Sequence, residues 1–555
     1  MNEREWVPLE PNEDFAAQVL AASRAQRGVN CAGAEVAASD IRAACLAADK
    51  ADPFGVRLAG ARITGPLDLR AFTISVALRF QDCDFTDPVN VEGARLHDLA
   101  ITTDLRKGSR NELPGLIALG AEIAHNLVLS GMVIRGETRA GGSGNRSAGV
   151  WLTGAEIGGN LLAVGTQILP ATGRAIHADR MRIAGNIRIE DVRATGEIRL
   201  PAMHLAGSLG LIGVELLPQD GRALDLNEAV IGNSLFLMNA PHTLARCRLR
   251  GRIEMSHTTI HGQMLIRGAD LSAPPTGRGG QFYTVESTGG RTFLLGPRLS
   301  VQGSLVMEGD TVVRGGLLMP GARLHGGVRL AGAVWNEGDL ALDLKQTIVE
   351  GDLHAPGLSV EGTVRLDNAR IEGPLTMEYA TVAKPLDRRG VSAVGLKVAG
   401  DVQCRGLAAS TPSDWSTSSV PLSTAGCAPM APPWCSAPGP STHRLRGAPR
   451  SKPDSPTSEG ASTLAGGSSR ERPTSRARPR PISPMIRSMT GPATPSSAVS
   501  PTSGSRLVRP GAKRSGTPAP ASPGCRACGL MTRVPGSTWP QCSVRPATAT
   551  VRKLC

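Results

Sequence analysis

Apolar and polar residues alternate with a period of two through much of residues 53–404. In the segment ARITGPLDL, residues 61–69, the apolar or small positions are Ala61, Ile63, Gly65, Leu67 and Leu69. Such alternation is typical of short β-strands with one buried face. We therefore expect an all-β structure for this part of the chain.

The alternation recurs in a repeat made of an aliphatic residue, any residue, glycine, any residue and a second aliphatic residue. Its glycines are Gly65, Gly159, Gly185, Gly207, Gly262, Gly303, Gly326, Gly351, Gly373 and Gly400, and two further copies have His125 and Asn233 instead. From residue 125 onward most centres lie 22 to 29 residues apart, which is a solenoid spacing. Leucine-rich repeats share this spacing, but the linkers here are too short for a helix of ordinary length. The pattern predicts a parallel β-solenoid of roughly a dozen coils.

Two copies, VRLAGARITGPLDL (56–69) and VRLDNARIEGPLTM (364–377), place a Gly-Pro pair inside the alternation. Proline inside a ladder strand would remove a hydrogen-bond donor. We therefore interpret Gly65-Pro66 and Gly373-Pro374 as corners between strands, where glycine adopts a positive φ. Asn233 fits the same role because asparagine tolerates the left-handed region.

Residues 12–50 are alanine-rich and carry an apolar stripe through Ile41, Ala44 and Cys45, which indicates helices. The ends of a solenoid require caps. We expect residues 1–52 to form an N-terminal helical cap, residues 53–404 the β-solenoid and residues 405–555 a disordered tail.

The formal charge of +13 is concentrated in that tail. Residues 406–555 hold 19 Lys and Arg against 4 Asp and Glu, whereas the rest of the chain holds 42 against 44. We therefore expect no nucleic-acid binding by residues 1–404. The tail lacks Phe, Tyr and Asn but contains six cysteines and three tryptophans. Its residue types share GC-rich codons, which favours a shifted reading frame near residue 405, with a genuine basic linker as the alternative.

The body of the chain contains Cys31, Cys45, Cys83, Cys247 and Cys404, an odd number at irregular spacing. This favours a reducing compartment over a disulfide framework. The N-terminus has no signal-peptide pattern, and no apolar run reaches the roughly 20 residues of a spanning helix. A cytoplasmic protein is the expectation.

Several motifs resemble sites, and each has a simpler interpretation. GGSGNRSAG, residues 141–149, lacks the third glycine of a dinucleotide fingerprint and reads as a loop between coils. Cys525 and Cys528 form a CxxC without thioredoxin-like context. His257 and His261 would suit a metal only on a helix, and His325 recurs at the position of His261, which favours solvent exposure. The outward charges could form a carbohydrate-binding or hydrolytic face, although a solvated ladder is favoured: Arg62, Asp68, Glu156, Arg182 and Asp343.

The segment IRAACLAA, followed by GVRLAGARITGPLDLRAFTISVALRFQDCDF and many LxxAxIxGxLxL coils, resembles a family of long actinobacterial proteins. Its members are labelled oxidoreductase or membrane-associated oxidoreductase, and they are similar to pentapeptide-repeat-like and bactofilin-like β-solenoids. The resemblance covers roughly residues 30–404. It implies redox activity, and by analogy a peripheral membrane contact.

These observations favour a structural, scaffold or binding protein, with an oxidoreductase, possibly membrane-associated, as the alternative that the resemblance implies. We assign no catalytic, cofactor-binding or metal-binding residue, and no cofactor. The expected partner is another protein or a second copy of the chain, contacted through the ends or faces of the solenoid.

Overall fold

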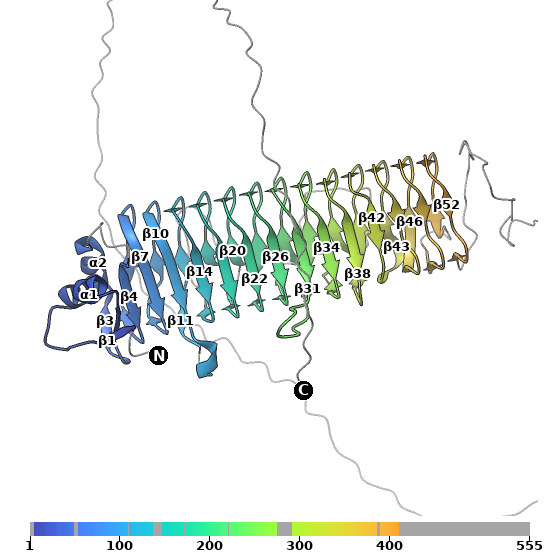
Figure 1. Ribbon diagram of the computed structural model, residues 1–555. Helices are drawn as coiled ribbons and strands as arrows, with labels where there is room; N and C mark the ends of the chain where they lie inside the picture. The colour runs from blue at the N-terminus through green and yellow to red at the C-terminus, as the bar shows by residue number, and fades with distance from the viewer. Residues whose placement is uncertain are drawn as a thin grey trace, which may run out of the picture. The chain divides into compact units, whose positions relative to one another are not determined.

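The computed structural model describes residues 5–48, 54–108, 110–136, 147–170, 173–219, 221–274, 291–385 and 389–409. In these residues the chain forms a parallel β-solenoid of about 14 turns, with two short helices near its N-terminus. The coils stack in chain order from α1 (Phe15–Arg24) and α2 (Ala38–Ala47) to β52 (Val402–Gln403), as Figure 1 shows. The all-β parallel solenoid predicted from the alternation is confirmed.

Each regular turn contains four short strands. One turn consists of β20 (Arg174–His177), β21 (Arg182–Ile183), β22 (Ile187–Glu190) and β23 (Arg193–Ala194). The next consists of β24 (Glu197–Arg199), β25 (His204–Leu205), β26 (Leu209–Ile212) and β27 (Glu215–Leu216). Each strand pairs in parallel with its counterpart in the neighbouring turn. The solenoid is therefore four-sided.

Equivalent strands of successive turns form four columns. We name them column 1 (through β21 and β25), column 2 (β22 and β26), column 3 (β23 and β27) and column 4 (β20 and β24). Among the described residues, columns 1 and 2 belong to a 27-stranded sheet and columns 3 and 4 to a 23-stranded sheet. Inward-facing aliphatic side chains such as Ile176, Ile183 and Ile189 fill the interior and are at most 4% exposed.

The left-handed corner of the coil does not lie where the repeat glycines predict it. Gly65 has φ +81°, as expected, but Gly185, Gly373 and Asn233 do not adopt a positive φ. Positive φ values recur instead at the turn between columns 4 and 1, for example at Arg180 (φ 58°). The prediction of a left-handed corner at Gly373 and Asn233 is wrong, because that bend is made five residues earlier in the coil.

Apart from Gly65, where a Cβ would meet nothing within 4 Å, the repeat glycines are required by the close approach of neighbouring coils. A Cβ on Gly185 would lie 2.5 Å from the carbonyl oxygen of Gly159, and a Cβ on Gly373 would lie 2.8 Å from that of Gly351. The backbone N–H of Gly185 donates to the same Gly159 oxygen at 2.9 Å. A side chain at this position would therefore push two hydrogen-bonded coils apart.

The residue after the repeat glycine explains the prolines. At this position the backbone N–H donates to a side chain of the preceding coil rather than to its backbone. Asn160 donates to Oδ1 of Asn126, and Asn186 donates to Oδ1 of Asn160, both at 2.8 Å. A proline here, as in Pro374, removes no donor from the backbone ladder. The interpretation of Gly-Pro as a break between strands is confirmed on this ground.

The two Gly-Pro copies lie on opposite sides of the solenoid. In the first copy, β4 (Val56–Ala59) is in column 2 and β6 (Leu67–Asp68) is in column 4. Between them, β5 (Arg62–Thr64) belongs to a separate three-stranded sheet with β3 (Glu35–Ala37) and β8 (Asp84–Phe85), which extends column 3 toward the N-terminus. In the second copy, β46 (Ser359–Arg365) ends in column 4, and β47 (Arg370–Ile371) and β48 (Leu375–Thr376) occupy columns 1 and 2. Each half of a turn thus carries the same motif.

Both ends of the strand array extend past the boundaries expected from the sequence. β1 (Trp6–Pro8) already pairs with β2 (Gly28–Asn30), which in turn pairs with β4, and α1 lies between β1 and β2 in the chain. β53 (Ala408–Ala409) pairs with β49 (Thr381–Ala383). The capping role of the helices stays a prediction. The segment from residue 410 onward, which holds nearly all of the expected tail, lies outside the described residues.

Candidate functional site

A groove of about 820 Å³ runs along the outer face of column 1. It crosses β10 (Arg95–Thr102), β13 (Glu122–Ile123), β17 (Glu156–Ile157), β21, β25 and β29 (Val230–Ile231). Successive coils are spaced by about 4.8 Å, so these six strands span about 24 Å. The groove is thus elongated along the solenoid axis.

The floor of the groove exists because one outward position is small in five consecutive coils. This is the position between the aliphatic residue and the glycine of the repeat. It is occupied by Ala124, Gly158, Ala184, Ala206 and Gly232, all of which line the groove and are exposed. A row of larger side chains at this position would fill the space.

Bulky polar side chains occupy the same position at both ends of the groove. His97 precedes Ala124 in the row, and its ring lies 4.4 Å from that of His125. His261 follows Gly232, and its Nδ1 lies 3.2 Å from Oε1 of Gln302. The groove is therefore bounded along the solenoid axis.

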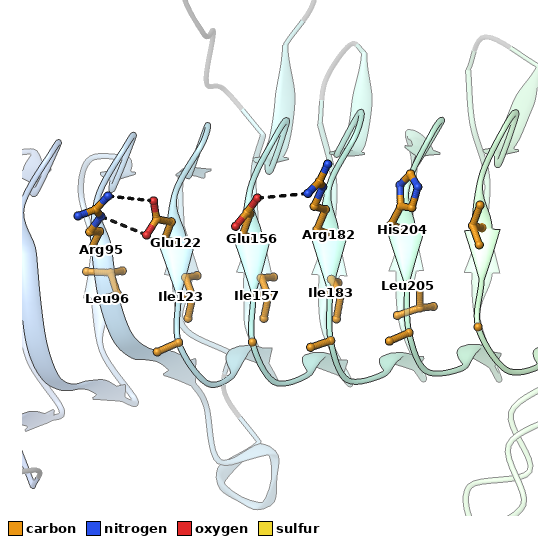
Figure 2. A pocket seen from close by; sticks show the side chains of 16 residues that line it. Arg95, Leu96, Glu122, Ile123, Glu156, Ile157, Arg182, Ile183, His204 and Leu205 are labelled. Carbon is orange, nitrogen blue, oxygen red and sulfur yellow. Dashed lines mark hydrogen bonds and ion pairs between the residues drawn. The ribbon is translucent and has the colours of Figure 1, made fainter. Parts of the chain in front are cut away.

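Charged side chains two residues before the floor form one wall. Figure 2 shows Arg95, Glu122, Glu156, Arg182 and His204 in a line on successive strands. Arg95 Nε lies 3.1 Å from Glu122 Oε2, and Arg182 Nη1 lies 4.0 Å from Glu156 Oε1. All four of these paired side chains are more than half exposed, so each pair contributes little to stability. The wall carries paired charges, while the floor is uncharged.

A second group of charged side chains lies on the outer face of column 4 and is largely buried. Arg222 contacts Glu197 at 2.8 Å, Asp225 at 3.0 Å and Glu254 at 2.8 Å. Arg199 joins Asp225 at 2.7 Å and Asp179 at 2.8 Å. These residues form ion pairs with one another across four coils. The ion pairs form a closed network, which we call the brace, rather than an open site.

Burial and pairing act in opposite directions on these carboxyl groups. Burial raises the pKa of Glu197 and of Asp225, although neighbouring arginines partly offset it. Burial alone would also raise the pKa of Asp179, but hydrogen bonds from His177 and Arg199 lower it to about 2. The brace therefore contains carboxyl groups whose proton affinities differ from one coil to the next.

The outward charges singled out from the sequence do not form one face. Arg62 belongs to column 3, Asp68 and Asp343 to column 4, and Glu156 and Arg182 to column 1. The expectation that Asp343 faces solvent is wrong, because its side chain is 0% exposed and paired with Arg365. An outward side chain becomes buried when a longer side chain at the paired position of the next coil lies over it, as Arg365 does over Asp343.

The remaining motifs are not brought together into a site. His257 faces Arg298 at 3.5 Å, His261 faces Gln302, and His325 faces Glu350 at 2.9 Å. Across the described ranges, no group of three or more His, Cys, Asp and Glu could hold a metal ion. Most of GGSGNRSAG, and both Cys525 and Cys528, lie outside the described residues.

The five body cysteines are free thiols. Burial raises the pKa of Cys45, Cys83 and Cys247 to about 12 and that of Cys31 and Cys404 to about 11. Thiols with such values carry almost no thiolate at neutral pH. The redox activity implied by the resemblance stays a prediction.

The fold and groove define a four-sided parallel β-solenoid repeat protein. Comparison with protein-family models, curated proteins and solved structures finds no match for the chain. In the part of the chain that the structure describes, neither helix has the length and apolar character to cross a membrane.

The groove is the feature that sequence reasoning missed. The signal was present in part, because the residue before the repeat glycine or its replacement is Ala or Gly in five consecutive copies and His in the copy that follows, whereas the coil of His97 lacks the repeat glycine. Reading that single position across the aligned repeats would have found it.

Proposed function

We propose that this protein is a binding scaffold whose column 1 groove holds an extended segment of a partner protein. The observation that supports this proposal most strongly is the uninterrupted floor from Ala124 to Gly232. A flat solenoid face needs no such row of small residues. The groove offers one continuous surface along the stacking axis.

The chemistry of the groove favours a polypeptide occupant. An uncharged floor beside a wall of paired charges resembles the apolar centre and polar rim of protein interfaces. An extended chain rises about 3.3 Å per residue, so about seven residues would span the 24 Å groove. Every second side chain of such a segment would face the floor, and small apolar side chains would fit there.

A scaffold role agrees with the architecture of the molecule. A solenoid presents the same backbone geometry at every coil, which positions a long ligand without a mobile hinge. The paired charges of the wall, Arg95 with Glu122 and Arg182 with Glu156, would set the register and orientation of the segment more than its affinity. Protein binding therefore requires no additional domain.

The proposal is tested by selecting binding peptides and then filling the groove. Random dodecamers displayed on phage are selected on the full chain, and enriched peptides are measured by fluorescence anisotropy. Ala184→Trp fills the floor, whereas Ala399→Trp places the same side chain at the same repeat position outside the groove, and both alanines are exposed.

We expect enriched peptides to bind the wild-type chain and Ala399→Trp equally, and to bind Ala184→Trp at least tenfold more weakly. Failure to enrich any peptide, or equal binding by both variants, would contradict the proposal. Sedimentation velocity on the same proteins separates peptide binding from self-association of the chain.

A further inference from the structure

A second recess of about 310 Å³ lies on the outer face of column 2, near the N-terminus. It crosses β4, β7 (Thr73–Gln81), β10 and β14 (Leu127–Ser130). Its volume is at the lower end of the range for small-molecule sites. The recess is on a different column from the groove and contains none of the residues that line it.

Strand register explains how the recess forms. One outward row runs through Gly28, Arg57, Arg79, Ala100 and Val128 on consecutive strands. The Trp6 ring covers Gly28, where a Cβ would lie 2.4 Å from the indole Cζ3. Trp6 and Val128 thus form the end walls, and the small side chain of Ala100 leaves space beside Arg79.

Two arginines, Arg57 and Arg79, and one aspartate, Asp98, line this recess. Arg79 Nη2 donates to Asp98 Oδ2 at 3.1 Å. Arg57 is in register with Arg79, and within the described residues its guanidinium contacts the Phe54 ring, 4.3 Å from the centroid, and no carboxylate. Burial lowers the pKa of Arg57, as does Arg79, while Glu5 and Asp98 act in the opposite direction. Among the described residues, the Arg57 guanidinium thus has no carboxylate oxygen within ion-pair distance.

Asp98 also leaves one acceptor unused. The residue is 8% exposed, and its Oδ1 atom is buried without a hydrogen-bond partner among the described residues. A buried acceptor of this kind is unfavourable unless a donor reaches it. The amide side chains of Gln81 and Asn126 and the hydroxyl of Thr102 also line the recess.

We propose that the recess binds a small anion that also carries hydroxyl groups, of the class of sugar phosphates and sugar acids. The anionic group would pair with Arg57, because a guanidinium binds phosphate and carboxylate through two parallel hydrogen bonds. A ligand hydroxyl would hydrogen-bond to the Asp98 carboxylate, and Trp6 would cover an apolar face of the ligand. Neither a bare anion nor an uncharged sugar would satisfy both groups.

Isothermal titration calorimetry on the full chain tests this inference with four probes. Glucose 6-phosphate and glucuronate carry both features, whereas inorganic phosphate and glucose each carry one. We expect saturable binding of at least one of the first two, at least tenfold tighter than either of the last two. The comparison between the first two probes distinguishes a phosphate from a carboxylate headgroup.

Variants assign the binding to this recess. Arg57→Ala should lower the affinity for the bound probe at least tenfold, and Asp98→Asn should lower it at least fivefold. Arg329→Ala should leave it unchanged, since Arg329 is an exposed outward residue of column 2 far along the chain. Arg57→Ala breaks no ion pair to a described residue, and thermal unfolding checks that each variant is folded. Any of three results would overturn the proposal. These are the absence of saturable binding, inorganic phosphate that binds as tightly as glucose 6-phosphate, and binding by Arg57→Ala that equals binding by the wild-type chain.

Discussion

The backbone N–H of Gly185 donates a 2.9 Å hydrogen bond to the carbonyl oxygen of Gly159 in the preceding coil, and a Cβ on Gly185 would lie 2.5 Å from that oxygen. Any side chain at residue 185 must therefore lengthen a ladder hydrogen bond or displace a coil. We expect Gly185→Val to lower the free energy of unfolding by more than about 1 kcal/mol. Chemical denaturation of the full chain measures the difference.

Arg180→Gly is the matched control within the same coil. Arg180 is exposed and has φ 58°, so glycine relieves left-handed strain there, while the added freedom of the unfolded chain offsets the gain. We expect a change within about 0.5 kcal/mol of zero. If Gly185→Val proves as mild as Arg180→Gly, close coil packing is not the reason for the repeat glycine.

The period-two alternation predicted the buried side chains correctly because it reflects purely local strand geometry. Ile63, Leu67 and Leu69 are all at most 1% exposed, as residues 61–69 indicate. The column that each unit occupies could not be predicted in the same way. Both halves of a turn carry the same motif, so Ile63 and Ile157 align in sequence although they lie in columns 3 and 1.

Contacts between coils could not be predicted from the sequence either. The burial of Asp343 depends on Arg365 in the following coil, and the groove depends on what five coils place side by side. A repeat of variable length does not reveal which residues become neighbours until strand register is known. The fold class could therefore be predicted from the sequence better than the candidate site.

The Asp343–Arg365 pair provides a second prediction. Asp343 Oδ1 accepts from Arg365 Nε at 3.0 Å, and its side chain is 0% exposed. Arg365→Met would leave a buried carboxylate without its cation, and we expect a loss of about 3 kcal/mol or more. The double variant Asp343→Leu/Arg365→Met should recover most of that loss, because Leu318 occupies the neighbouring position in the same row. Equal losses in the single and double variants would show that the charge is not the cause.

Asp179 makes the stability depend on pH in a defined window. Its pKa is lowered from 3.8 to about 2 in the folded chain. A lowered pKa stabilises the fold above about pH 4, and this contribution is lost as the pH falls toward 2. Asp179→Asn should therefore destabilise the chain by about 2 kcal/mol at pH 6 and by clearly less at pH 2. Unfolding of both proteins at the two pH values provides the test, and a pH-independent difference would refute the assignment.

The buried thiols should resist alkylation in the folded chain. Cys45, Cys83 and Cys247 combine burial with a pKa raised to about 12, which suppresses the reactive thiolate. Peptide mapping after iodoacetamide treatment at pH 7.5 should find these residues unmodified, and fully modified once denaturant is added. Rapid labelling of any of them in the native chain would indicate an accessible thiolate and would favour the redox alternative.

Photo-cross-linking along the groove tests most directly whether it binds an extended segment. A selected peptide is made in two forms, with a benzophenone at its N-terminal or its C-terminal end, and cross-linked residues are mapped by mass spectrometry. We expect one form to label column 1 near Leu96 and Ala124, and the other to label it near Ala206 and Gly232, which lie at opposite ends of the groove. Labels from both forms on the same coil, or on residues outside column 1, would contradict the proposed function.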